Sequence, residues 1–568
     1  MDEALGADLV AAGMIERARM HYATQWTKES EMADYDAIVV GGGHNGLAAA
    51  SVLAKKGLKV ACLEKTTWVG GMAATKELFK GFKHNVGAWA LILLHEEMRK
   101  LLELETYGFE VITPKTSFCT FGVPGDVPFL AYNDPTTFID HMIKDHGPDA
   151  MHGLMGLFEY LQVFGNLMEA ARFREPEPIE QLIANAPDAR SREILAHCFY
   201  GSVIDIIRKF FPDPEKHRCI TGSMSAMSID GTHMGPYSPG SACSMAYHYT
   251  AGGVANLFKM ARGGIGTLSE ALLRSLQAHG GEVRYKAQVK RFVLEGGKIV
   301  GVELRNGEKI SSHVVLSSLD ARTTFLDLVG EEHLPPTFVH AVKEIEYTNG
   351  YIQIHLTLKE LPEFTGHLAF ANENNIRWLM SYIPSPEHLA RCWEQYRCGK
   401  VPDDPVSYYC IPSLLDPTLA PPGYHTCTFF SHYFPVDIPQ SRHTELKQVM
   451  ADRVINQMVK YAPNFKDAIV DKAILTHQYF ETTFGITGGD FCHGLLHPGQ
   501  MWDSRPLRGW SNYRTPIESL YLCGSGCHPG PGITGVPGYN GAQAALQDMA
   551  GVRPEQSIAA RRAVGLQA

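Results

Sequence analysis

Three glycines near the N-terminus have a spacing that suits phosphate binding. Gly41, Gly43 and Gly46 stand in the run GGGHNG. In such a run the first glycine permits a tight turn, the second lets backbone approach a pyrophosphate, and the third lets a helix pack closely on a strand. Glu64 follows later, where its carboxylate can accept hydrogen bonds from ribose hydroxyls. Together these residues predict a dinucleotide site.

The segments around the glycines predict the elements that would position them. Residues 36–41 (DAIVVG) form a β-branched run typical of a buried parallel strand, and residues 59–64 (KVACLE) form another. Between them, residues 47–56 favour a helix. The N-terminus of that helix would present free N–H groups and a favourable dipole to phosphate. At this point FAD and NAD both remain open.

Two more glycine-rich segments favour FAD over NAD. Gly70 and Gly71 lie just beyond the second strand, where bare backbone can run beside the rest of a long dinucleotide. Near the C-terminus, the strand-like run 520–523 leads into the glycine-rich stretch 524–538, and a helix-like segment follows at 540–549. This is a second place where backbone can approach a phosphate or a ring. The combination predicts FAD.

Longer motifs carry a family resemblance. They are GGGHNGLAAASVLAKKGLKVACLEK (41–65), VGGMAATKEL (69–78), SPGSACSMAYHY (238–249), RGGIGTLSEAL (262–272) and the long match at 488–538. Nearly the whole chain after residue 34 resembles the phytoene desaturase and carotenoid isomerase-type FAD-dependent oxidoreductases. It is most similar to the subgroup of pyridine nucleotide-disulphide oxidoreductase domain-containing protein 2.

The resemblance implies an α/β fold (α+β overall). A Rossmann-like FAD-binding domain would be assembled from discontinuous segments, with an inserted substrate domain of mixed sheet and helices. The implied division is an N-terminal helical extension (1–33), an FAD-binding domain (34–120, 256–334 and 481–550), a substrate-binding region (121–255 and 335–480) and a C-terminal tail (551–568).

The resemblance also assigns cofactor contacts by position. Residues near the ADP and pyrophosphate would be Gly41, Gly43, Gly46, Glu64, Gly70 and Gly71, with Val289 on the adenine side. Residues along the ribityl chain and flavin ring would be Gly524, Gly526, Thr534, Gly535 and Val536. Within the same segments, His44, Asn45, Lys65, Met72 and Ser525 complete the predicted cofactor site.

Catalytic candidates come from the segments expected to face the ring. They are His493, His528, Tyr237 and His248. Histidine titrates near neutral pH and can act as an acid or a base, although the chain has 25 histidines and most of them must serve other roles. His493 and His497 have a spacing that suits a metal on a helix, but Gly494 and Pro498 disfavour that helix, so no metal is predicted.

Composition narrows the class of protein. A net charge of −10 argues against nucleic acid as a partner, and 12 scattered cysteines suit a reducing compartment. No apolar run reaches the ~18 residues that a membrane-spanning helix needs. These features predict a cytoplasmic protein, and its N-terminal extension leaves open a peripheral membrane contact or a homodimer.

Three functions follow from these observations. The first is an oxidoreductase of dehydrogenase, desaturase or reductase type, which would act on a lipophilic, unsaturated or cyclic small molecule with an unidentified electron acceptor or donor. The second is a non-redox isomerase or hydratase that uses reduced FAD. The third is a non-catalytic flavoprotein that serves as an interaction module.

Overall fold

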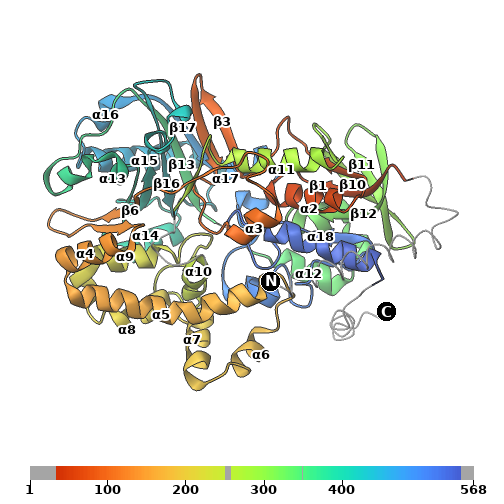
Figure 1. Ribbon diagram of the computed structural model, residues 1–568, viewed down its shortest axis with the longest axis horizontal. Helices are drawn as coiled ribbons and strands as arrows, with labels where there is room; N and C mark the ends of the chain where they lie inside the picture. The colour runs from red at the N-terminus through yellow and green to blue at the C-terminus, as the bar shows by residue number, and fades with distance from the viewer. Residues whose placement is uncertain (1–32, 250–257, 348, 552–568) are drawn as a thin grey trace.

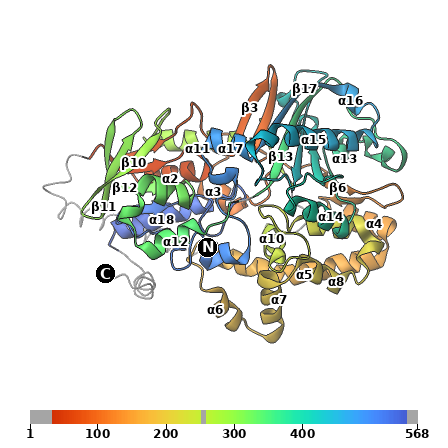
Figure 2. The same ribbon diagram turned by 180° about the vertical axis from the view of Figure 1, so that it is seen from behind.

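The computed structural model describes residues 33–249, 258–347 and 349–551 (Figure 1). The predicted N-terminal extension and C-terminal tail lie outside the described residues, apart from one residue of each. Two seven-stranded sheets organise the chain, and Figures 1 and 2 show them on opposite sides of the molecule. No helix among the described residues is both long and apolar enough to cross a membrane.

The first sheet contains the predicted nucleotide strands. Its order is β10-β11-β12-β1-β2-β9, with β18 paired to β12. The pairs β12–β1, β1–β2, β2–β9 and β12–β18 are parallel, whereas β10, β11 and β12 pair antiparallel. The strands are β1 (Tyr35–Val40), β2 (Val60–Leu63), β9 (Glu282–Arg284), β10 (Val289–Glu295), β11 (Lys298–Leu304), β12 (Lys309–Ser317) and β18 (Leu520–Leu522).

Three helices pack beside this sheet. Helix α2 (His44–Lys55) contacts both α11 (Gly266–Ala278) and α18 (Val536–Met549). Helix α2 is rich in alanine, and all of its residues except the last are buried. Small side chains let neighbouring helices approach closely, because little volume separates their backbones. The N-terminal and C-terminal glycine segments are thereby brought together.

The second sheet has the order β17-β13-β16-β15-β14-β6-β7 and is antiparallel except where β14 meets β6. Its strands are β6 (Thr116–Phe121), β7 (Phe129–Tyr132), β13 (Tyr351–Leu358), β14 (Leu379–Tyr382), β15 (Ser407–Cys410), β16 (His425–His432) and β17 (Ile469–Thr476). Strand β13 is buried along its whole length, as expected of an apolar central strand with neighbours on both sides. The hairpin β3 (Ala73–Phe79) and β4 (Phe82–Gly87) leads from the first sheet to β16.

Helices cover the second sheet on both faces (Figures 1 and 2). One group holds α4 (Pro135–His146), α5 (Pro148–Ala171), α7 (Ala189–Tyr200), α8 (Val203–Phe210), α9 (Arg218–Ala226) and α10 (Ser241–His248). Other helices are α14 (Pro386–Arg397), α15 (Gln440–Val459) and α17 (His477–Phe484). Shorter helices are α6 (Ile179–Ala184), α13 (Asn374–Arg377) and α16 (Phe465–Ala468), whereas α3 (Glu96–Leu101) and α12 (Pro336–Lys343) lie beside the first sheet (Figures 1 and 2).

The expected α/β fold is confirmed, since a largely parallel sheet with packed helices is joined to a mixed sheet and a helical region. Strands of the first sheet come from three separate stretches of the chain, so that sheet is discontinuous in sequence. The domain boundaries stay a prediction.

Candidate functional site

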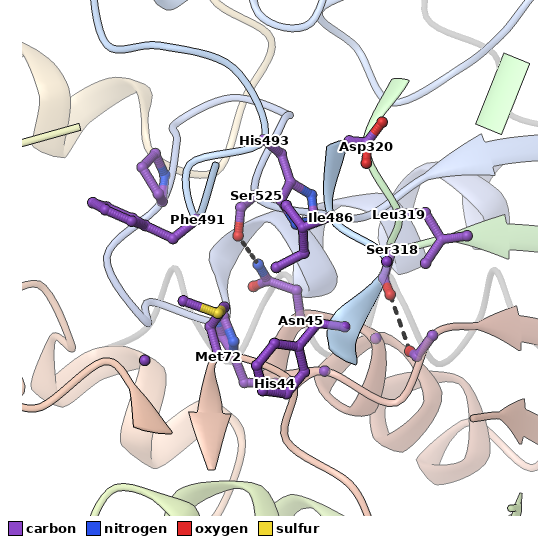
Figure 3. A pocket seen from close by; sticks show the side chains of 18 of the residues that line it. His44, Asn45, Met72, Ser318, Leu319, Asp320, Ile486, Phe491, His493 and Ser525 are labelled. Carbon is purple, nitrogen blue, oxygen red and sulfur yellow. Dashed lines mark hydrogen bonds between the residues drawn. The ribbon is translucent and has the colours of Figure 1, made fainter. Parts of the chain in front are cut away.

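A cavity of about 490 Å³ lies between the two sheets. This volume falls in the range of about 300–1,000 Å³ typical of small-molecule and cofactor sites. Its lining comes from the ends of β1 and β2, the segment after β12, and strands β13 and β16. Figure 3 shows side chains from both ends of the sequence pointing toward it. The predicted residues that line the cavity are Gly41, Gly43, His44, Asn45, Gly46, Glu64, Lys65, Gly71, Met72, Val289, Ser525, His248 and His493.

Each of the three motif glycines has a different structural role. Gly41 has a φ of +97°, which favours glycine at this tight turn. A Cβ on Gly46 would lie 2.0 Å from the carbonyl oxygen of Gly41, so the helix can pack here only without a side chain. A Cβ on Gly43 would meet nothing within 4 Å. Gly43 therefore faces open space in the cavity, where a ligand can approach the backbone.

The N-terminus of α2 is open to an anion. Gly43 is its N-cap residue, no side chain caps the helix, and its first turn contains no acid. Gly71 lies opposite, where its Cβ would be 3.4 Å from the Cα of Gly43. Gly70 does not line the cavity, but its N–H donates to the carbonyl of Gly42 (2.8 Å) and holds the two segments together. Free N–H groups and the helix dipole suit a pyrophosphate at this point.

Glu64 is buried at the end of β2. Its two carboxylate oxygens accept hydrogen bonds from the N–H groups of Gly42 (2.9 Å) and Thr66 (2.7 Å). Lys65 follows it, and partial burial lowers the pKa of that amine. Val289, at the start of β10, lines the same cavity. Glu64, Lys65 and Val289 therefore place an acid, an amine and an apolar side chain where the adenosine of a dinucleotide would bind.

Residues of helix α2 connect the two glycine-rich segments. The Asn45 amide donates to the Ser525 hydroxyl (3.1 Å), a bond that Figure 3 shows across the cavity. His44 precedes Asn45, and burial lowers the pKa of its imidazole to about 3. The ring is therefore neutral at physiological pH. Met72 lies nearby in the same view.

The C-terminal loop meets the cavity at the predicted Ser525 and at three residues that were not predicted. Ser525, Pro531, Gly532 and Ile533 line it. Gly524 instead packs against the backbone of Ser318. A Cβ at this position would lie 2.4 Å from the Ser318 carbonyl oxygen, so only glycine fits. The other predicted residues of this loop that do not line the cavity are Gly526, Thr534, Gly535 and Val536. Gly526 faces the backbone of His493, while Thr534 and Val536 line a small neighbouring pocket.

A buried arginine supports this loop. Arg505 is 1% exposed, and its guanidinium donates to the carbonyl oxygens of Ser525 (2.9 Å) and Gly494 (3.1 Å), and also to that of Cys492. One side chain thereby holds the segment that contains His493 against the loop that contains Ser525. The sequence offered no local signal for this role.

The four catalytic candidates separate into two pairs. His493 and His248 line the cavity. Burial lowers the pKa of His493, an effect that the nearby Asp320 opposes. The expectation that the other two face the ring is not met. His528 is fully buried outside the lining, where its Nε2 contacts the Ala171 carbonyl (3.1 Å) and its ring packs against Trp502. Tyr237 is on the surface, and its hydroxyl donates to Glu387 (2.7 Å).

Several residues of the cavity were not predicted. Trp89, Asp230, Gln353, Phe430 and Phe491 all line it. The Gln353 amide donates to the carbonyl of Gly87 (2.7 Å), and the Trp89 ring stacks on Phe258 with centroids 5.4 Å apart. Each comes from a different part of the chain without a recognisable local motif. Within the described residues, no group of three or more His, Cys, Asp or Glu side chains is arranged to hold a metal ion.

Comparison with known proteins identifies the family. The family model "Flavin containing amine oxidoreductase" matches residues 46–537. The chain belongs to this family. It is therefore an FAD-dependent oxidoreductase, and the uncapped helix and the open space at Gly43 fit an FAD pyrophosphate.

Several relatives are similar to the chain over most of its length, and a solved structure shares its fold. Pyridine nucleotide-disulfide oxidoreductase domain-containing protein 2 of Rattus norvegicus is 29% identical over 91% of this chain and 94% of its own length. Prolycopene isomerase of Daucus carota is 28% identical, over 92% and 81%. A limonene dehydrogenase protein of Castellaniella defragrans is 26% identical, over 94% and 99%. A crystal structure of an oxidoreductase from Methanosarcina mazei shares the fold, with a TM-score of 0.58 and 16% identity, over 90% and 99%.

Proposed function

We propose that this flavoprotein dehydrogenates or reduces a lipophilic, unsaturated or cyclic small molecule. The proposal rests on the two-sided lining of the cavity. Glycine-rich segments line it beside the first sheet, and aromatic side chains line it toward the second sheet. When bound, FAD supplies hydride transfer to or from its N5 atom. The chain itself has to bind the cofactor, exclude water and orient the substrate.

The glycine segments would hold the cofactor. The N–H groups at the start of α2 would bind the pyrophosphate, Glu64 would accept hydrogen bonds from the ribose, and Val289 would contact the adenine side. Ser525 and Ile533 would lie toward the ring, since they line the cavity from the C-terminal loop. Asn45 would keep these two parts in register through its bond to Ser525.

The opposite wall would bind the substrate. It presents Trp89, Ile92, Phe430, Phe491 and Leu496 to the cavity. Large apolar side chains bind substrate by burying apolar surface, which contributes about 25 cal/mol per Å². This wall favours a substrate with a long apolar or cyclic body. The names of the carrot and Castellaniella relatives refer to such molecules, prolycopene and limonene.

Anaerobic flavin bleaching tests the proposal. Purified holoenzyme would be mixed with a panel of polyenes, cyclic terpenes and small polar alcohols, and the absorbance of oxidised flavin would be followed. We expect one or more apolar compounds to bleach the flavin and the polar alcohols to leave it oxidised. Phe430→Ala should weaken the apparent affinity for the active compound, while the exposed Tyr424→Ala should not. Failure of every apolar compound to exchange electrons with the flavin, in either direction, would contradict the proposal.

A second candidate is an isomerase or hydratase that uses reduced FAD. The observation in its favour is the similarity to prolycopene isomerase over 92% of this chain. Here product would form only after anaerobic reduction of the flavin, and the flavin would remain reduced through many turnovers. Stoichiometric reoxidation of the flavin by substrate would instead support the reductase.

A further inference from the structure

Polar side chains from separate elements converge on the aromatic side of the cavity. Asp230 follows α9, and its Oδ2 lies 3.6 Å from Nε2 of His248 at the end of α10. Both residues line the cavity. Asp230 also acts electrostatically on His432 of β16 and Tyr408 of β15. The Asp230 carboxylate is only partly exposed, and burying a carboxylate is costly unless it has a partner, which His248 supplies here.

The hydrogen bonds of His248 fix how the pair can hold a proton. Nδ1 of its ring lies 2.8 Å from the carbonyl oxygen of Ser244, which can only accept, so Nδ1 carries a hydrogen. Nε2 faces the Asp230 carboxylate, which is also an acceptor when it is ionised. A proton taken from a substrate can therefore settle on Nε2 or on the carboxylate, which lie 3.6 Å apart. Without that proton, the pair is a base that opens onto the cavity.

The neighbours of the pair keep their own protons fixed near neutral pH. Burial lowers the pKa of His432 to about 4, although Asp230 opposes the shift, so that ring stays neutral. Burial raises the pKa of the Tyr408 hydroxyl and of the Cys492 thiol well above their ordinary values, and Asp230 adds to both shifts. The Tyr408 hydroxyl and Nε2 of His432 are buried without a hydrogen-bond partner among the described residues. Neither residue lines the cavity, so neither competes with Asp230 and His248 for a proton from a bound ligand.

We propose that Asp230 and His248 accept the proton that a substrate loses when it is dehydrogenated. This inference rests on the function proposed above. The substrate would have a hydrogen on each of two adjacent atoms, as H–C–C–H or H–C–O–H. One C–H bond breaks and its electron pair leaves with the hydrogen as hydride to the bound FAD, the two-electron oxidant. The neighbouring C–H or O–H bond breaks with its electrons forming the new C=C or C=O bond, and its proton passes to the pair. In the reverse direction, the pair returns the proton.

Single-turnover flavin reduction tests the role of the pair. Holoenzyme variants Asp230→Asn and His248→Gln would be compared with wild type, using the compound that bleaches the wild-type flavin fastest. We expect the rate constant of flavin reduction to fall ~100-fold or more, the usual contribution of a general base. Asp230→Glu should recover part of the rate. His233→Gln, a partly exposed histidine on the same segment outside the cavity, should leave the rate unchanged.

The pH dependence distinguishes this role from a structural one. In wild type, the rate of flavin reduction should depend on pH, because the pair has to accept the proton that the substrate loses. Asp230→Asn should flatten that profile while FAD affinity stays unchanged. An unchanged rate constant and an unchanged pH profile in Asp230→Asn would overturn the inference while leaving the proposed function intact.

A readout without substrate is also available. In holoenzyme labelled with ¹⁵N-histidine, the His248 signals are the ones lost in His248→Gln. The Nε2 signal should differ between wild type and Asp230→Asn, because only wild type has a carboxylate 3.6 Å from this nitrogen. If no compound bleaches the flavin, the proposed function fails, and this comparison still decides whether the pair holds a proton. An identical Nε2 signal in both proteins at every pH would overturn the inference.

Discussion

Gly43 and Gly46 lie close together at the start of α2 and should respond differently to an added methyl group. In Gly43→Ala the new Cβ has no protein atom within 4 Å, so the apo protein should unfold at the same denaturant concentration as wild type. The same methyl group occupies the space where the pyrophosphate approaches the backbone. FAD affinity should therefore fall at least tenfold, which is about 1.4 kcal/mol. Fluorescence titration of the apo protein with FAD measures this.

Gly46→Ala is the matched control at the same loop. Its Cβ would lie 2.0 Å from the Gly41 carbonyl oxygen, so the strand and helix must separate. Overpacking of this kind costs about 1–3 kcal/mol, and urea unfolding of the apo protein should show it. If Gly43→Ala bound FAD as tightly as wild type, the pyrophosphate would not lie against the backbone of Gly43.

Asp490 contributes a specific pH dependence of stability. It is fully buried, and burial raises the pKa of its carboxyl to about 6, against backbone hydrogen bonds from Cys492 and Gly494 that oppose the shift. The folded state then binds a proton more tightly than the unfolded state. Stability from this group is complete below about pH 4 and is lost as the pH rises through about 6. The loss corresponds to about 3 kcal/mol at most.

Comparison with Asp490→Asn isolates this effect. The two thermal unfolding midpoints should lie closest near pH 4, and the midpoint of the variant should rise relative to wild type as the pH approaches 7. A constant difference across this range would show that the Asp490 carboxyl titrates alike in the folded and unfolded states.

At the scale of elements, helix α18 can pack closely on its neighbours, α2 among them, only because it has glycines at the contacts. A Cβ on Gly538 would lie 2.1 Å from the carbonyl oxygen of Asn45 in α2. On the same helix, a Cβ on Gly541 would lie 2.5 Å from the carbonyl oxygen of Leu522 in β18, so α18 also packs closely on that strand. Gly538→Ala should push α18 away from α2 and lower the free energy of unfolding by about 1–3 kcal/mol. FAD affinity should fall as well, because Asn45 holds Ser525. Differential scanning calorimetry and FAD titration measure the two effects.

Gln543→Ala, on the same helix, provides the control. No hydrogen bond of the Gln543 side chain is found among the described residues, so its loss should change stability by no more than about 0.5 kcal/mol. Equal midpoints for Gly538→Ala and Gln543→Ala would mean that the two helices can separate without cost.

At the scale of the whole molecule, the sequence was informative where chemistry depends on local backbone. Gly41 and Gly46 lie within one strand–helix–strand unit, so their spacing alone predicted the tight turn and the close helix packing that the structure shows. The ribose contact of Glu64, in the same unit, stays a prediction. Asp230 and Phe430 could not be predicted, because they meet only after two distant parts of the chain pack around one cavity. Tyr237 shows the converse, since it adjoins a family motif but its side chain points to the surface.

The shared cavity predicts that FAD stabilises both sheets. Residues of β13 and β16, represented by Gln353 and Phe430, line the same space as Gly43 and Glu64. Binding to the folded state alone adds about 2.7 kcal/mol at a free FAD concentration 100 times Kd. Hydrogen exchange measured by mass spectrometry should therefore slow on FAD addition in β13 and β16 as well as in β1 and β2. In Gly43→Ala, the same FAD concentration should give less protection in all four strands. Protection confined to β1 and β2 would show that the cofactor stabilises its own sheet without reaching the wall where the substrate is proposed to bind.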